Sequence, residues 1–357
     1  MDSATYEFAE QLYRRTSNSW RAAEAMVPHV FVESGFPIRL SSILELRQII
    51  DTMQEGRAGS IVYELRGLDD NDVKAIATAL RRFLDFYVVT FQDRQPLIPV
   101  DTMLNAYLYD QRYKAFKDKS QVLEIGAGCA YLPFFDTSRD SIGCYDLIEA
   151  TQSFYLLQHK VAAFCYGADF QDMAMGLPPS GNTGTLEPSI NLVEIDKPVR
   201  ARLFPWWQAG EAFRTRYNLI LSHANLCEMD KTGRDFYIRS AYDALLDDGY
   251  FYVRDFGLPR LGKEREEIAR TFSEAGFRAL SMVLKPSVHA NVSMASILYI
   301  KEGHPDYDAT PSSYEEIRLP LENPTVREMF FMDSPEKPKT HTNQIVPRIL
   351  DCLRSKI

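Results

Sequence analysis

The sequence has little cysteine, and its cysteines are badly placed for metal or disulfide chemistry. The 357 residues include five cysteines with no Cys-x-x-Cys pair and no His–Cys cluster at metal-ligand spacing. This spacing argues against a zinc site and against a disulfide framework. We therefore expect free thiols, mostly buried, and no metal centre. The five positions are 129, 144, 165, 227 and 352.

Long apolar runs and an excess of positive charge are also missing. No stretch approaches the ~18 apolar residues of a membrane span, and the opening MDSATYEFAEQ has neither the basic segment nor the apolar core of an export signal. Asp and Glu number 49 against 40 Lys and Arg, a net charge of −9, which argues against a broad nucleic-acid surface. We expect a cytoplasmic protein with a small-molecule partner and neither a membrane nor a nucleic-acid partner.

Apolar residues, in contrast, are abundant. Hydrophobic residues make up 45% of the chain and aromatic residues 12%, enough for a large core. Up to about residue 117 the apolar spacing is helical, with a capping-box pattern at 42–45 and helices expected from Asp72 and over 102–117. We interpret 1–118 as a helical accessory or substrate region, 119–303 as the core domain and 304–357 as an extension that forms a wrap or lid.

From residue 121 short apolar strands alternate with helices, which is typical of a parallel sheet covered on both faces. The segment 169–197 is rich in Gly, Pro, Ser and Asn and is predicted to be an insertion. The last two strands are predicted to form a hairpin. Seven strands are expected, near 122–125, 141–148, 199–204, 217–222, 249–256, 278–284 and 294–300.

The first of these strands runs directly into a glycine loop, in QVLEIGAGCAYLP at 121–133. A strand, a Gly-x-Gly turn and a helix expose backbone amides to a ligand. The third glycine of a dinucleotide loop is missing, because Tyr131 stands in its place. Glu124 lies within the apolar strand, where an unpaired buried carboxylate costs several kcal/mol. It suits a cationic ligand without phosphate, such as S-adenosylmethionine, which carries an ammonium and a sulfonium.

These motifs resemble the class I, S-adenosylmethionine-dependent methyltransferases over roughly residues 120–302. The resemblance lies in Glu124-Ile-Gly-Ala-Gly128, the acid Glu149 after the second strand, and a seven-strand succession that closes with a hairpin. It implies a Rossmann-like sheet with S-adenosylmethionine as cofactor. Three further segments, YDLIEATQSFYLLQ, SHANLCEMD and DALLDDGYFYVRDFG, are similar in part to bacterial sugar O-methyltransferases.

The resemblance also implies a set of cofactor-binding residues. Glu149 would take both ribose hydroxyls, with Asp146, three residues earlier, as its rival for that role. Trp206 would stack on adenine or, alternatively, be a core residue. Tyr109 and Tyr113 precede the glycine loop on a helix and are core by periodicity, or else cover the cofactor. The predicted cofactor-binding residues are Glu124, Gly126, Ala127, Gly128, Glu149, Ala150, Trp206, Ser222 and His223.

His223 and Glu228 are the predicted catalytic residues. His223 follows the fourth strand, at the edge where ligands gather, and its pKa range suits a general base for a hydroxyl acceptor. Glu228 lies on the same loop and would orient the acceptor; with Asp230 and Asp255 it could alternatively hold a divalent ion. The alternative roles are a hydrogen-bonded packing residue for the histidine and solvated loop residues for the acids.

We therefore expect an O-methyltransferase that acts on a sugar or glycosylated metabolite. Its rivals are transfer to nitrogen in a small molecule or a protein, a nicotinamide-dependent oxidoreductase, and a cofactor-binding subunit without catalysis. The loop SHANLC lacks the Asn-Pro-Pro-Tyr type motif that favours amide or adenine nitrogen. A homodimer is one open possibility for the assembly.

Overall fold

The structure, a computed structural model, describes most of the chain. The described residues are 1–16, 37–52, 58–92, 95–116, 118–135, 142–175, 199–257, 262–286, 293–310, 323–330, 337 and 341–355.

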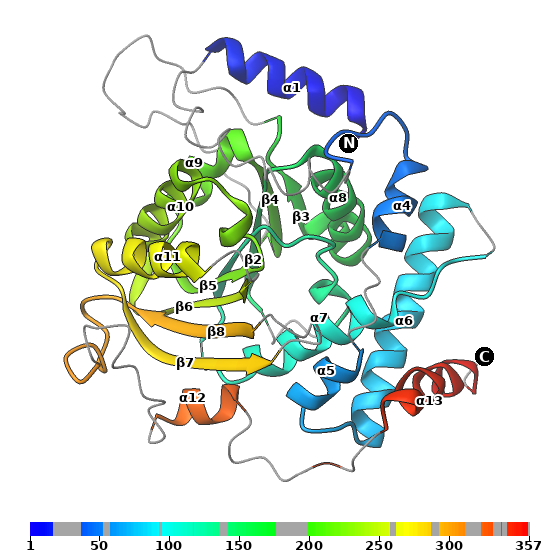
Figure 1. Ribbon diagram of the computed structural model, residues 1–357. Helices are drawn as coiled ribbons and strands as arrows, with labels where there is room; N and C mark the ends of the chain where they lie inside the picture. The colour runs from blue at the N-terminus through cyan, green and yellow to red at the C-terminus, as the bar shows by residue number, and fades with distance from the viewer. Residues whose placement is uncertain are drawn as a thin grey trace.

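A single twisted sheet lies at the centre of the molecule (Figure 1). Its strand order is β3-β4-β2-β1-β5-β6-β8-β7. The strands from β3 to β6 pair in parallel, and β8 pairs antiparallel with both β6 and β7. The predicted α/β class, with a mostly parallel sheet and a closing hairpin, is confirmed. The strands are β1 (Gln121–Ile125), β2 (Cys144–Glu149), β3 (Phe170–Asp172), β4 (Ala201–Pro205), β5 (Tyr217–His223), β6 (Leu245–Gly257), β7 (Arg278–Pro286) and β8 (Ser293–Ile300).

Over the described residues the sheet has eight strands, so the predicted count of seven is wrong. The additional strand is β3, which has three residues and lies at the start of the segment predicted to be an insertion. It pairs in parallel with β4 at the edge of the sheet. A strand this short has no readable periodicity, and only its pairing with β4 creates it. The rest of that segment, 176–197, lies outside the described residues.

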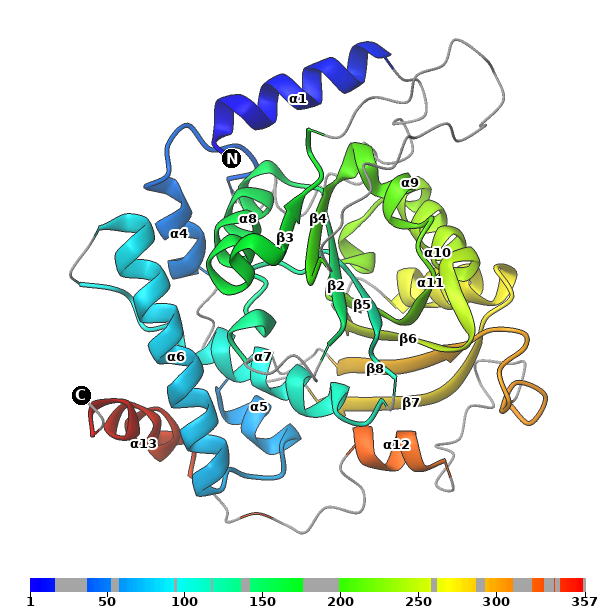
Figure 2. The same ribbon diagram turned by 180° about the vertical axis from the view of Figure 1, so that it is seen from behind.

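Helices cover both faces of the sheet (Figures 1 and 2). On one side α6, α7 and α8 pack together with α5, and on the other α9, α10 and α11 form the second layer. The described helices are α1 (Ser3–Thr16), α4 (Glu45–Thr52), α5 (Ala58–Glu64), α6 (Asp70–Phe91), α7 (Val100–Tyr113), α8 (Gln152–Tyr166), α9 (Ala209–Ala212), α10 (Lys231–Ala244), α11 (Gly262–Glu274), α12 (Pro324–Met329) and α13 (Thr342–Arg354).

The longest helix, α6, begins two residues before its predicted start. Asp69 caps it by accepting hydrogen bonds from the amides of Asn71 and Asp72, and the Asp72 carboxylate accepts from the Asp69 amide in return. This reciprocal capping box satisfies amides that have no partner within the helix. The predicted box at 42–45 is different, because the Glu45 carboxylate accepts from both the amide and the hydroxyl of Ser41.

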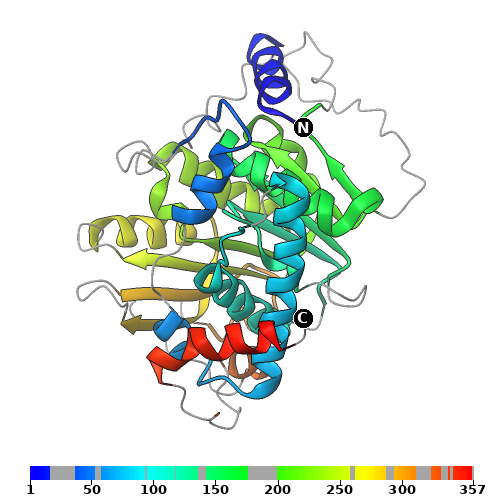
Figure 3. The same cartoon turned by 90° about the vertical axis from the view of Figure 1, so that its right-hand side faces the viewer.

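The C-terminal extension packs on the N-terminal helices. Figure 3 shows α13 lying across α6, and Ile345, Ile349 and Leu353 of α13 are buried. At the two ends of this contact, Arg348 donates to the Leu68 carbonyl over 2.9 Å and Arg81 donates to the Leu353 carbonyl over 3.0 Å. Chain segments that are far apart in sequence thus build one helical layer.

Candidate functional site

The carboxyl ends of β1, β2 and β5 meet at one edge of the sheet. β1 lies between β2 and β5, so the residues that follow these strands are brought together. The Gly126 amide donates to the Ile148 carbonyl over 2.8 Å, which joins the glycine loop to the end of β2. In parallel α/β sheets this edge is where ligands bind. The edge carries Gly126 and Gly128 after β1, Glu149 in β2 and His223 in β5.

Both loop glycines have a backbone conformation that favours glycine. Gly126 has φ +68° and Gly128 has φ +56°. A Cβ at Gly126 would lie 2.3 Å from Nδ2 of Asn225, whereas a Cβ at Gly128 would meet no described heavy atom within 4 Å. Asn225 donates to the carbonyls of Ile125 and Gly126 and accepts from Ser222 Oγ over 2.5 Å. Asn225 therefore covers Gly126, and the open side of the loop is at Gly128.

The contact at Gly126 predicts the effect of adding a side chain there. Gly126→Ala should lower the free energy of unfolding by at least about 1–2 kcal/mol, because an L-residue is strained at this φ and its Cβ would displace the Asn225 amide. Urea titration measures this loss. Gly128→Ala, at a similar φ but with open space, is the matched control and should lose less. Equal losses would contradict a role for the Asn225 contact.

Glu124 is buried, and its carboxylate has partners within the chain. Oε1 lies 2.9 Å from Nδ1 of His223, and Oε2 accepts from the Tyr145 hydroxyl. The three side chains lie on one face of the sheet, since Tyr145 pairs with a residue two positions before Glu124, and His223 lies two positions after the residue that pairs with Glu124. The sequence argument gave this acid a cationic ligand as its partner, whereas within the chain His223 and Tyr145 already bond to it; a contact between Glu124 and the cofactor stays a prediction. The loop sequence gave no signal that a histidine 99 positions later would take that place.

His223 is held from three sides. Its Nε2 lies 3.0 Å from the Tyr113 hydroxyl, and the Tyr109 ring stacks on the imidazole with the ring centroids 3.8 Å apart. An ionised Glu124 carboxylate can only accept, so it favours the tautomer with a proton on Nδ1 and leaves Nε2 to accept from Tyr113. Burial lowers the pKa of His223 and raises that of Tyr113 well above its ordinary value. The site therefore holds a neutral, oriented imidazole.

Glu149 ends β2 and accepts several hydrogen bonds. Its Oε1 accepts from the amides of Ala150 and Thr151, both over 2.9 Å, and from the Thr151 hydroxyl over 3.1 Å. Its Oε2 accepts from Nε2 of Gln158 over 2.7 Å. Burial raises the pKa of Glu149 to about 6, and these hydrogen bonds oppose that shift. The predicted residue Ala150 thus contributes its backbone amide to hold the carboxylate.

Gln158 was missed in the sequence analysis. It is fully buried on α8, and its Nε2 also donates to the Gly128 carbonyl over 2.9 Å. It therefore joins the glycine loop to the acid of β2. The available signal was weak, since a glutamine within the largely apolar run of α8 also fits a structural role.

Asp146, the rival for the ribose role, faces the other side of β2. It is fully buried and pairs with Arg202 at 2.5 and 2.8 Å, and it accepts from the Tyr217 hydroxyl over 2.8 Å. Side chains alternate along a strand, so three residues separate opposite faces. The geometry thus places Asp146 in an ion pair within the sheet layer and leaves Glu149 at the edge.

Trp206 is buried against α1. Its Nε1 donates to Glu10 Oε1 over 3.1 Å, and the Arg14 guanidinium lies 5.1 Å from its ring centroid. Trp207 packs edge-on against the same ring. The indole thus contacts the N-terminal helix. This fits the alternative of a core tryptophan better than a ring that is free to stack on adenine. Stacking on adenine stays a prediction.

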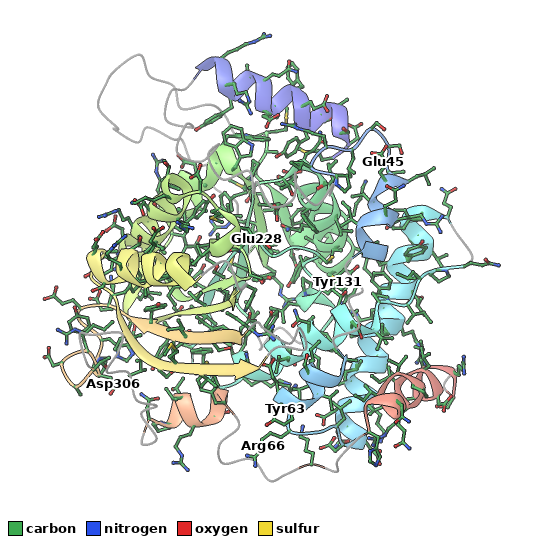
Figure 4. The ribbon with its side chains drawn as sticks, viewed as in Figure 1. Glu45, Tyr63, Arg66, Tyr131, Glu228 and Asp306 are labelled. Carbon is green, nitrogen blue, oxygen red and sulfur yellow. The ribbon has the colours of Figure 1, made fainter. Side chains whose placement is uncertain are left out.

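The remaining predicted residues lie around the same edge. Ala127 is half-buried between the two loop glycines, and the buried Ser222 supports Asn225. Glu228 follows Asn225 in a short 3-10 turn and lies near the centre of the molecule in Figure 4. Asp230 caps α10 by accepting from the Gly233 amide over 2.8 Å, and the Asp255 side chain lies outside the described residues. No group of three potential metal ligands occurs among the described side chains.

A buried ionic cluster adjoins His223. Glu64 of α5 accepts from Arg112 of α7 over 2.6 Å and from Arg254 of β6 over 2.8 Å. Arg254 also donates to the Tyr109 hydroxyl over 2.8 Å, which connects the cluster to the ring stacked on His223. The two guanidiniums are among the causes that lower the pKa of His223. The cluster fixes α5 and α7 on β6 and helps to keep the imidazole neutral.

Comparison with known proteins gives likeness in fold only. No family model matches the chain, and no curated protein is similar to it in sequence. In the described part of the chain, no helix is long and apolar enough to cross a bilayer. Among solved structures, the chain is similar to a TehB-like SAM-dependent methyltransferase from Corynebacterium glutamicum, with 13% identity over 55% of this chain and 88% of that one and a TM-score of 0.35. It is also similar to StiE O-MT, with 13% identity over 62% and 83% of the two chains and a TM-score of 0.40. A third likeness is to the cyclase SpnF, with 11% identity over 58% and 83% of the chains and a TM-score of 0.38.

Proposed function

We propose that this protein is an S-adenosylmethionine-dependent methyltransferase that acts on a hydroxyl group of a small polar molecule. The observation that carries the proposal is the imidazole of His223, which is held at Nδ1 by Glu124 and lies at the same sheet edge as Gly128 and Glu149, where burial lowers its pKa. A neutral base is what an alcohol acceptor needs, because an alcohol becomes a good nucleophile only as its proton leaves. The acceptor class, a sugar or a glycosylated metabolite, comes from the partial resemblance of three sequence segments.

The residues at this edge fit the nucleoside end of that cofactor. Gly128 leaves room for close approach of a ligand to the backbone, and Oε2 of Glu149, which accepts one hydrogen bond, from Gln158, is the oxygen offered to a ribose diol. The buried Oε1 of Gln158 has no hydrogen-bond partner among the described residues. When bound, S-adenosylmethionine would supply a methyl group already activated by its sulfonium.

The chain's own part in the chemistry is to orient and to remove a proton. Glu124 holds Nδ1 of His223, so that Nε2 faces the Tyr113 hydroxyl. We infer that the acceptor hydroxyl takes the place of the Tyr113 hydroxyl and gives its proton to Nε2. Holding the acceptor oxygen in line can account for up to about 7–11 kcal/mol of the barrier.

This role predicts the effect of removing the imidazole. His223→Ala should lower turnover by ~10²-fold or more and leave the affinity for S-adenosylmethionine nearly unchanged. Methyl transfer from radiolabelled cofactor to a panel of monosaccharides and glycosides measures turnover, and calorimetry measures the affinity. His304→Ala, a buried histidine distant in sequence and bonded to the Asp306 amide, is the matched control. Full turnover in His223→Ala would remove this residue from the mechanism.

Calorimetric titration with S-adenosylmethionine and with NAD tests the cofactor itself. Binding of the former alone is expected, because the chain lacks the third glycine of a dinucleotide loop. Binding of NAD alone would replace the proposal with an oxidoreductase. Transfer to amine or protein acceptors, with none to hydroxyl compounds, would replace O-methylation with N-methylation.

One observation favours a second candidate, a cofactor-binding partner subunit without catalysis. The lone pair of His223 Nε2 is already engaged by Tyr113, and Asn225 covers Gly126. Under this alternative S-adenosylmethionine binds but the acceptor panel shows no transfer. The variant Tyr113→Phe frees Nε2 of His223 and separates the two candidates. It should retain methyl transfer if the chain is an enzyme.

A further inference from the structure

The acid of the first strand is held by one side chain from each neighbouring strand. Oε2 of Glu124, in β1, accepts from the Tyr145 hydroxyl of β2, and Oε1 lies 2.9 Å from Nδ1 of His223 in β5. The three residues occupy adjacent strands, because β1 is hydrogen-bonded to both β2 and β5. Each carboxylate oxygen thus has its own partner, one on either side of the strand.

Tyr145 lies behind the acid, on the side away from the ligand-binding edge. It pairs with Val122, two residues before Glu124 along β1, whereas His223 lies two residues beyond Leu221, the partner of Glu124 in β5. The Tyr145 ring is fully buried. Glu124 therefore connects a phenol in the interior of the molecule to an imidazole at the edge.

The electrostatic surroundings of His223 oppose one another. Burial lowers the pKa of His223, the hydrogen bond and charge of Glu124 raise it, and the guanidiniums of Arg254 and Arg112 lower it. Both guanidiniums pair with Glu64. The titratable and charged side chains that face His223 are Glu124 of β1, Tyr109, Arg112 and Tyr113 of α7, and Tyr252 and Arg254 of β6.

The Tyr145 hydroxyl acts on the influence of Glu124. A phenol that donates to one oxygen of a carboxylate stabilises its negative charge, so less of that charge attracts a proton to the neighbouring imidazole. The same hydrogen bond fixes the rotation of the carboxylate, and hence the direction of the oxygen that holds Nδ1. In a buried network of this kind, a change at one end alters the hydrogen bond at the other.

We propose that Tyr145 is a positioning residue for His223: its hydroxyl holds the Glu124 carboxylate, which orients the imidazole through Nδ1, and it limits how strongly Glu124 draws a second proton onto the ring. Tyr145 acts through Glu124 and contacts no ligand. The consequence for methyl transfer rests on the proposed function, because it assumes that His223 removes the proton of the acceptor. The effect on the imidazole itself requires no such assumption.

NMR spectroscopy of the histidine side chains in the full-length chain tests this role without an activity measurement. Nitrogen-15 spectra report which ring nitrogen of His223 carries the proton, and a pH titration of the ring proton on Cε1 gives the midpoint of protonation. The signals are assigned with His223→Ala. Tyr145→Phe removes only the hydroxyl, and thermal unfolding checks that each variant is folded.

Tyr217→Phe is the matched control. Tyr217 is equally buried, lies in the adjacent strand β5, and its hydroxyl donates to a different buried carboxylate, that of Asp146, over 2.8 Å. A purely structural effect of deleting a buried phenol hydroxyl should therefore occur in both variants. A second comparison adds Tyr145→Phe to a Glu124→Gln chain, in which the hydroxyl no longer has a charge to stabilise.

We expect neutral His223 to carry its proton on Nδ1 in the wild type. Tyr145→Phe should raise the midpoint of His223 by at least about half a pH unit, roughly a threefold gain in proton affinity. Tyr217→Phe should leave the midpoint unchanged, and Tyr145→Phe should have little further effect in the Glu124→Gln chain. The acidic limb of the pH profile of methyl transfer should move to higher pH together with the midpoint.

Three results would overturn the inference. One is a folded Tyr145→Phe variant in which His223 titrates at the same pH as in the wild type, or in which it titrates in neither chain before unfolding. Another is an equal shift in Tyr217→Phe. The third needs no variant: a wild-type His223 with its proton on Nε2 is not oriented through Nδ1.

Failure of the proposed function is a separate outcome. A raised midpoint of His223 with an unchanged pH profile of methyl transfer would keep the role of Tyr145 and exclude His223 as the base. The same holds if no acceptor is methylated, because the NMR titration is carried out without cofactor or acceptor.

Discussion

Glu64→Ala is expected to lower the free energy of unfolding by about 3–5 kcal/mol. The Glu64 carboxylate lies between the guanidiniums of Arg112 and Arg254, at 2.6 and 2.8 Å, and all three side chains are buried. Its removal leaves two cations facing each other in the interior, with Nε of each already unpaired among the described residues. A loss of this size is a large part of the total stability of an ordinary domain.

Urea unfolding followed by tryptophan fluorescence measures this loss. Glu211→Ala is the matched control, because Glu211 also pairs with an arginine, Arg214 at 2.8 Å, but in a partly exposed position. The control should change stability by less than about 1 kcal/mol, since exposed ion pairs contribute little. A loss below about 1 kcal/mol in Glu64→Ala would show that the cluster does not fix α5 and α7 on the sheet.

Glu149→Gln should weaken the binding of S-adenosylhomocysteine by roughly 10²–10⁴-fold if the carboxylate accepts both ribose hydroxyls. Each hydrogen bond to a charged acceptor contributes roughly 1.5–3 kcal/mol, and the amide end would also place its NH₂ group against that of Gln158. Asp146→Asn is the control, since Asp146 faces the other side of β2 and should change stability more than affinity. Similar affinity losses in Glu149→Gln and Asp146→Asn would show that Glu149 has no specific role in binding the ribose.

The same residue gives the binding a pH dependence. The pKa of Glu149 is raised to about 6, so the folded protein binds a proton at this site more readily than the unfolded chain does. The contribution of Glu149 to stability therefore falls as the pH rises from about 4.5 to about 6. The affinity for a diol changes with pH in the opposite direction, because the ionised carboxylate is the better hydrogen-bond acceptor. In the wild type this affinity should fall roughly tenfold from pH 7 to pH 5. In Glu149→Gln it should stay constant over the same range.

The parallel sheet was predictable because its evidence is local. The apolar run of β1, the acid at the end of β2 and the near-continuous apolar character of β5 each lie within one short segment. Glycines with positive φ at 126 and 128 follow from the turn that the strand must make. That Gly126, Glu149 and His223 lie at one edge follows from the shared direction of parallel strands, whatever their order. These features needed no knowledge of distant contacts.

The partners of these residues depend on contacts across long distances in the sequence. His223 meets Glu124 across 99 positions, and Arg254 meets Glu64 across 190. Such pairs have no periodicity or spacing that a linear pattern could reveal. The same is true of the three-residue strand β3, which exists only because β4 offers it an edge. The sequence alone determined where the strands end and which polar groups stand at their ends. Only the tertiary structure decided which of those groups are already satisfied by one another, because hydrogen bonding between side chains is set by their positions in space.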